Sequence, residues 1–280
     1  MAVQAVLGLA FPGAYRDLEW IRATWSGNDR VSLLVAVPML VVALAAARRR
    51  SARGTLLWLG LLGYAGYNYA FYLFGAALNA FFPIYVALVV LSVAALVLAL
   101  ARLDVDQLSP VPVGRVRAVA GYLAVVGVGL AGVWLIAWAG YAFAGRPTPV
   151  EPEAFKVVAA LDLTVMCPAL VTGGVLLWRA RPWGVVVAVL ACVQGALYLL
   201  VLSVNAVVAV AHGIARAPGE LPLWGPLALA TAAAAALLLA GTRPHGHPVH
   251  GIPAELSATA PPRQDGGTAK PEEKVGRSTR

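Results

Sequence analysis

The sequence predicts an all-α fold, a polytopic bundle of about seven transmembrane helices with the N-terminus outside and the C-terminus in the cytoplasm. Three observations carry this prediction. Of the 280 residues, 60% are hydrophobic and only 12% are charged, against about 25% charged in an average soluble domain. The charges gather in short segments between long apolar runs. The alternating pattern of a membrane β-barrel is absent, so helices must satisfy the backbone groups in lipid.

The charge-free runs define the expected spans, because a helix needs about 17 to 25 mostly apolar residues to cross a hydrocarbon core about 30 Å thick. Between Arg53 and Arg102 lie 48 residues without a formal charge, enough for two helices joined by a turn near Asn79 and Pro83. The other five expected spans are 31–47, 116–144, 155–178, 185–211 and 223–241.

Three regions follow from this division. Residues 1–30 are expected to form an N-terminal interfacial segment, since 15–30 mixes charges with tryptophans as in a helix lying on a membrane surface. Residues 31–241 form the transmembrane helix bundle, and 242–280 are too polar to bury a core, which predicts a disordered cytoplasmic tail. The apolar start lacks the basic leader of a cleaved signal peptide. No internal repeat indicates the inverted halves of many transporters.

The basic residues predict the orientation. Of the 21 Lys and Arg residues, 15 fall in the tail and in three segments on its side of the membrane, and in short loops alone the count is nine against three. Such an excess marks the cytoplasmic side. The net charge of +8 is therefore a topological signal and an attraction to lipid headgroups rather than a sign of nucleic-acid binding. The 18 Arg against 3 Lys are typical of GC-rich coding, which predicts a bacterial inner (plasma) membrane.

Asp162 is the one acidic residue well inside an expected span, where a carboxylate costs about 2.5 to 3.5 kcal/mol on insertion scales. No Lys or Arg lies well inside a span, so a neutral, hydrogen-bonded carboxylic acid is the favoured state. Counting depth at about 1.5 Å per residue, and grouping residues by helix face, brings four more polar side chains near this acid. The sequence thus predicts a binding cluster of Asp162, Asn68, Tyr72, Gln194 and Tyr198.

Two functions fit this cluster. In one, the protein binds or transports a small solute, or a solute linked to protons, with Asp162 accepting a proton or contacting a cation. In the other, it is a non-catalytic membrane scaffold or assembly partner, whose polar residues only hold helices together at about 0.6 kcal/mol per hydrogen bond. Glycine-rich helix faces would allow a homo-oligomer in either case.

Other functions lack their signatures in this chain. It contains no P-loop, HExxH or GxSxG motif, and no lysine well inside a span could hold retinal as a Schiff base. We therefore expect no catalytic residue, cofactor or metal site, and a membrane enzyme ranks third. Metal binding by the HxHxxH run of the tail, His245, His247 and His250, is the weak alternative, because Gly246 and Pro248 preform no geometry.

Overall fold

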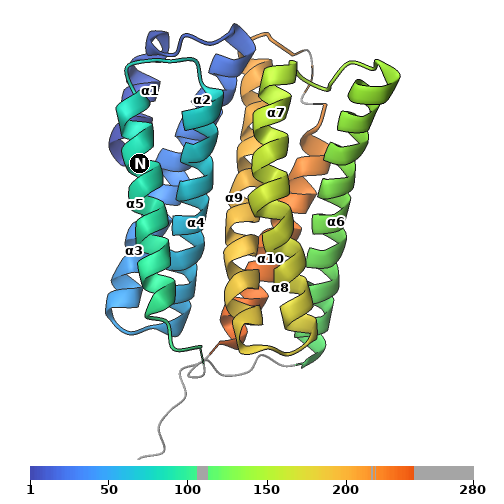
Figure 1. The fold of residues 1–280 in the computed structure, drawn as a ribbon. Coiled ribbons are helices and arrows are strands. Elements are labelled where there is room, and N and C mark those ends of the chain that lie inside the picture. The colour runs from blue at the N-terminus through green and yellow to red at the C-terminus, as the bar shows by residue number, and fades with distance from the viewer. Residues whose placement is uncertain (106–112, 216, 218, 243–280) are drawn as a thin grey trace, which may run out of the picture. The chain divides into compact units, whose positions relative to one another are not determined.

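The computed structural model describes residues 1–105, 113–215, 217 and 219–242, and these residues form a helical bundle without any strand (Figure 1). The all-helical fold class is confirmed for this part of the chain. Beyond Thr242, the expected tail lies outside the described residues, and so do His245, His247 and His250.

Within the described ranges, six helices are long and apolar enough to cross a membrane. They are Glu19–Arg48, Phe82–Ala101, Val116–Ala144, Pro152–Trp178, Pro182–Ala211 and Leu221–Gly241. A further helix, α4 (Ala52–Gly75), is 24 residues long and packs among them. Its tyrosines, glycines and single asparagine make it less apolar than the six.

The first of these six helices is longer than the charge pattern predicts. It starts as α2 (Glu19–Val31), passes through the π-helical turn η2 (Ser32–Ala36) and continues as α3 (Val37–Arg48). It therefore begins at Glu19 and not at residue 31, because the polar side chains near the end of α2 are buried in the bundle and do not end the helix. Before it come α1 (Ala2–Ala10), which packs on α2 and η2, and the short 3-10 helix η1 (Pro12–Ala14).

The remaining helices follow in an up-and-down order. They are α5 (Phe82–Ala101), α6 (Val113–Ala144), α7 (Pro152–Leu161), the π-helical turn η4 (Asp162–Met166), α8 (Cys167–Trp178), α9 (Pro182–Ala211) and α10 (Leu221–Gly241). We call the end of the bundle at which α2, α5, α7 and α10 begin the upper end, and the opposite end the lower end (Figure 1).

Both π-helical turns have the same cause, a proline two residues further on. Pro38 and Pro168 carry no N–H, and their rings clash with the carbonyl four residues back. The residue before each proline bonds one position further back, Val37 to the Ser32 carbonyl and Cys167 to the Asp162 carbonyl. This i→i−5 bond widens the helix locally. Asp162 thus lies at the first residue of a widened turn.

The element boundaries from residue 32 to residue 52 repeat after 130 residues. Counterparts at this spacing are the starts of η2 and η4 (32 and 162), the starts and ends of α3 and α8 (37 and 167, 48 and 178) and the starts of α4 and α9 (52 and 182). Arg50 and Ala180, which have positive φ of 59° and 50°, occupy the same place in the two connecting turns. We call residues 19–101 the N-unit and residues 152–241 the C-unit.

Helix packing repeats with the boundaries. Gly54 and Gly184 each lie against the backbone of the preceding helix, α3 or α8, at distances that leave no room for a Cβ atom. Gly27 of α2 faces Asn205 of α9, and the positions 130 residues away, Val157 of α7 and Gly75 of α4, also face each other. The chain therefore holds two three-helix units that run in the same direction, with α6 between them. The two units are therefore parallel and not inverted.

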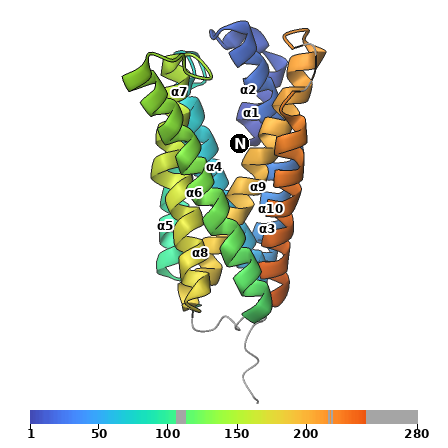
Figure 2. The ribbon, with the colours of Figure 1, turned by 90° about the vertical axis from the view of Figure 1, so that its right-hand side faces the viewer.

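The two units meet along α4 and α9, which we call the seam. These helices are counterparts and pack against each other, so the pseudo-twofold axis relating the units passes through their contact. A Cβ on Gly60 would lie 2.7 Å from the Cβ of Val193, and one on Gly63 would lie 3.4 Å from the Gln194 Oε1. Further contacts obey the same symmetry, because α2 packs on α9 and α7 packs on α4 (Figure 2).

Candidate functional site

Asp162 is completely buried, with an exposed fraction of 0%. Its carboxylate accepts hydrogen bonds from the Tyr67 hydroxyl of α4 and from the Trp134 indole N–H of α6, the latter at 2.8 Å. The Tyr67 ring packs edge-on against Tyr198 of α9, with ring centroids 5.5 Å apart. No ion pair to this carboxylate occurs among the described residues. Neutral donors from two helices therefore hold the acid.

A second carboxylate, Asp29 of α2, is equally buried at 0% exposed, and the sequence analysis missed it. It accepts hydrogen bonds from the Tyr15 hydroxyl at 2.6 Å, the Tyr72 hydroxyl at 2.8 Å and the Gln4 amide at 3.2 Å. Tyr69 donates to Gln4 Oε1 at 2.9 Å and so fixes the orientation of that amide. Neutral donors from α1, α4 and the segment before α2 hold this acid.

Tyr15 lies between η1 and α2, before the first spanning helix. Burial, together with the nearby Asp29 carboxylate, raises the pKa of the Tyr15 hydroxyl above its ordinary value. The hydroxyl thus stays protonated and remains a donor to Asp29. One signal in the sequence could have revealed this site, since Trp25, Asn28 and Ser32 share a face with Asp29 at helical spacing.

The two carboxylates share a plan. Each accepts one tyrosine hydroxyl from α4 and one donor from a helix outside the two units, Gln4 of α1 or Trp134 of α6. Tyr67 and Tyr72 are five residues apart, which places them about 140° apart around α4 at 100° per residue. One helix therefore serves both acids from different faces.

The structure separates the five predicted site residues. Tyr198 lies near Asp162 through its contact with Tyr67, whereas Tyr72 donates to Asp29. Asn68 and Gln194 are both buried, at 5% exposed, and their amide nitrogens have no hydrogen-bond partner among the described residues. The rotation of each helix decides which of these groups meet.

Buried polar atoms without a described partner gather where α2 and η2, α4 and α9 lie together. They include Asn28 Oδ1, Ser32 Oγ, the Tyr64 hydroxyl, Asn68 Nδ2, Gln194 Nε2 and Asn205 Oδ1. An unsatisfied buried polar group costs about 1 to 3 kcal/mol. So many in one region indicate that water or a ligand supplies the missing hydrogen bonds.

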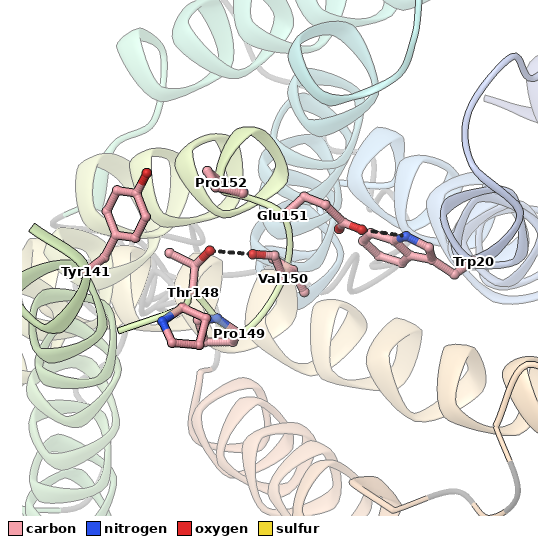
Figure 3. A pocket seen from close by; sticks show the side chains of 8 residues that line it. Trp20, Tyr141, Thr148, Pro149, Val150, Glu151 and Pro152 are labelled. Atoms are coloured by element: carbon pink, nitrogen blue, oxygen red, sulfur yellow. Dashed lines mark hydrogen bonds between the residues drawn. The ribbon is translucent and has the colours of Figure 1, made fainter. Parts of the chain in front are cut away.

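Two open pockets lie at the upper end, on either side of a contact between Trp20 and Glu151. The larger has a volume of about 640 Å³ and is lined by Trp20, Tyr141 and residues 147–152 (Figure 3). The second, of about 410 Å³, is lined by residues 18–20, Glu151 and residues 212–214. Between them the Trp20 indole N–H donates to Glu151 at 3.2 Å, a bond that joins α2 to the residue before α7. Neither described lining includes Asp162.

This arrangement can exchange protons at two carboxylates and can form hydrogen bonds with a polar molecule at the seam. Over the described residues, no group of three His, Cys, Asp or Glu side chains could hold a metal ion. Comparison with known protein families, curated proteins and solved structures finds no match to this chain.

Proposed function

We propose that this protein binds a small solute and transports it across a membrane, with proton exchange at Asp162. The observation that supports this most is a fully buried carboxylate, held by neutral donors, within a bundle of apolar helices. An ionisable group at such a depth is expensive, and in membrane proteins it commonly marks an ion or substrate pathway.

The proposal includes seven spans, with α4 as the seventh. Its 24 residues extend about 36 Å, more than the hydrocarbon thickness of about 30 Å. Its neighbours α3, α5 and α9 shield its tyrosines from lipid. The lower end carries the arginines of 48–53 and 179–181, so we assign it to the cytoplasm of a bacterial plasma membrane, with the N-terminus outside.

The seam is the proposed route. Transporters built from repeats bind substrate at the interface between the repeats, including those whose repeats are parallel. The contact of α4 with α9 is that interface in this chain, and Asn68 and Gln194 provide amide groups there that lack described partners. The pockets beside Trp20 and Glu151 lie where the route would open at the upper end.

Asp162→Asn tests the role of the acid. Asparagine keeps the shape, can accept from Trp134 and can donate to Tyr67, so the fold should survive while proton exchange is lost. In vesicles containing trapped pyranine, we expect wild-type protein to move protons when a transported solute is added, and Asp162→Asn to abolish this signal. Glu153→Gln, an exposed acid on the same helix, is the matched control. Unchanged proton movement in Asp162→Asn would refute the proposed role.

A scaffold is the second candidate, and one observation favours it. Both oxygens of Asp162 already accept hydrogen bonds, as expected if the acid only joins α4, α6 and η4. Under this alternative, no solute moves through the wild-type protein, and Asp162→Leu lowers the melting temperature because the donors of Tyr67 and Trp134 lose their acceptor. Under this alternative, the melting temperature would be measured on the homo-oligomer.

A further inference from the structure

Three pairs of polar side chains occupy equivalent positions in the two units. Ser32 and Asp162 open the π-helical turns of the N-unit and the C-unit. The same separation of 130 residues relates Tyr64 to Gln194, and Asn68 to Tyr198. Apart from proline, glycine and turn residues, the units share few identical side chains, so this common placement of polar groups indicates a shared role.

These positions lie along the pseudo-twofold axis. Gln194 Oε1 would be 3.4 Å from a Cβ on Gly63, the residue before Tyr64, which places Gln194 at the contact of α4 with α9. Asn68 and Tyr198 follow one helical turn later on the same faces. Ser32 neighbours Tyr64 from the side of η2. A molecule bound on this axis would therefore meet polar groups of both units.

The amide nitrogens of Asn68 and Gln194 have no partner in the described structure, whereas the hydroxyls of Ser32 and Tyr64 lie beside each other. All four side chains are more than nine-tenths buried. They are Ser32 (0% exposed), Tyr64 (1%), Asn68 (5%) and Gln194 (5%). Hydroxyls both donate and accept, and the two amide nitrogens donate. The site therefore offers both hydrogen-bond donors and hydrogen-bond acceptors to a bound molecule.

The charges around the seam select against anions. An anion would meet no cationic side chain among the seam residues named above, and the two nearby carboxylates already accept two or three hydrogen bonds each from neutral donors. Burying an uncompensated ion costs far more than burying a neutral group that is hydrogen-bonded. A neutral molecule that both donates and accepts matches the unpartnered polar groups.

We propose that the seam binds a small uncharged solute rich in hydroxyl or amide groups, held by Ser32, Tyr64 and Asn68 of the N-unit and by Gln194 and Tyr198 of the C-unit. This inference rests on the proposed transport function and specifies its substrate class. Two equivalent sets of polar groups facing one axis suit a solute whose hydrogen-bonding groups lie on both of its sides.

Uptake into proteoliposomes tests the inference, with the full-length protein and labelled glycerol, erythritol and mannitol as uncharged probes. Lysine and glutamate serve as charged probes. We expect uptake of at least one polyol above that of protein-free vesicles, and no uptake of the charged solutes. Tyr64→Phe and Gln194→Met should each reduce polyol uptake about five- to tenfold, as for the loss of one hydrogen bond in a buried site.

Tyr122→Phe is the matched control. It also removes a hydroxyl, but this one bonds Thr231 between α6 and α10 and none of the five proposed binding residues, so polyol uptake should stay unchanged. Melting temperatures of all variants in detergent show which are folded. Should Gln194→Met fail to fold, the test rests on Tyr64→Phe, which keeps the aromatic ring.

The outcomes separate this inference from the proposed function. Uptake of lysine or glutamate without any polyol uptake would overturn the substrate class and leave transport standing. Uptake of none of the five probes, with water permeability in stopped-flow light scattering equal to that of empty vesicles, would overturn both. A rise in water permeability alone would make the seam a water path and overturn the substrate class. Polyol uptake unaffected by Tyr64→Phe would remove the seam from the binding site.

Discussion

One methyl group added at Gly184 should push two helices apart. A Cβ there would lie 2.7 Å from the backbone carbon of Leu176 and from the backbone nitrogen of Leu177, and 2.9 Å from the Leu176 oxygen. Ordinary contact begins at about 3.4 Å, so α9 must withdraw from α8 by about 0.7 Å at this point. Because the obstacles are backbone atoms, no side-chain rotation relieves the clash.

The expected cost follows from two opposing effects. Overpacking a tight contact costs about 1 to 3 kcal/mol, whereas replacing glycine within a helix gains up to about 1 kcal/mol. We expect Gly184→Ala to lower the free energy of unfolding by about 1 to 2 kcal/mol. Gly54→Ala, the counterpart in the N-unit, would meet Ala46 and Ala47 at 2.5 to 2.8 Å and should destabilise by a similar amount.

Equilibrium unfolding in mixed micelles, followed by tryptophan fluorescence, measures these differences. Gly129→Ala of α6 is the control, since no described atom outside its own helix lies within 4 Å of that Cβ position, and it should be neutral or stabilising. If Gly184→Ala proves as stable as Gly129→Ala, the reasoning that α8 and α9 are too closely packed to admit a methyl group at Gly184 is refuted. If Gly54→Ala and Gly184→Ala change the free energy of unfolding in opposite directions, the equivalence of the two turns is refuted.

Three further predictions concern the hydrogen bonds of the upper half. Tyr72→Phe removes a donor to buried Asp29 and should cost about 1.5 kcal/mol or more in the same unfolding assay; a loss below about 0.5 kcal/mol would contradict it. Because the pKa of Tyr15 is raised from 10.0 in the folded state, wild-type stability should fall above about pH 10, where the unfolded chain ionises, by up to about 1.4 kcal/mol per pH unit. Melting temperatures between pH 8 and 11 should fall less steeply in Tyr15→Phe, and identical slopes would exclude this linkage. Trp20→Phe breaks an exposed hydrogen bond to Glu151 and should cost less than about 1 kcal/mol; a larger loss would make that contact structural.

The fold class could be predicted because lipid requires long apolar helices, and the chain shows them as charge-free runs. The start of the first of these helices could not be predicted in this way. Charges at 16, 17, 19 and 22 indicated an interfacial segment, yet Asp29 is buried among donors from Gln4, Tyr15 and Tyr72. Two of these partners precede the helix and one lies on another helix, so local hydropathy contains no information about them.

The site was predictable in part for a similar reason. Asp162 could be identified because an acid alone in an apolar run is rare. Its donors could not, since Trp134 reaches it only through the packing of α6 on η4, and Tyr67 only through the rotation of α4. Counting residues gives the depth of a side chain but not its direction around the helix. For this reason the sequence analysis grouped Tyr72 with Asp162, whereas the Tyr72 hydroxyl donates to Asp29.

The parallel arrangement of the N-unit and the C-unit explains why a helix without a counterpart stands between them. Each unit starts at the upper end and finishes at the lower end, so α6, 32 residues long, must carry the chain back before the second unit can start. Two separate three-helix chains could pair in the same way, but every substitution in them would then appear twice. Fusion into one polypeptide lifts that constraint and lets the halves specialise, as where a serine at position 32 corresponds to an aspartate at position 162.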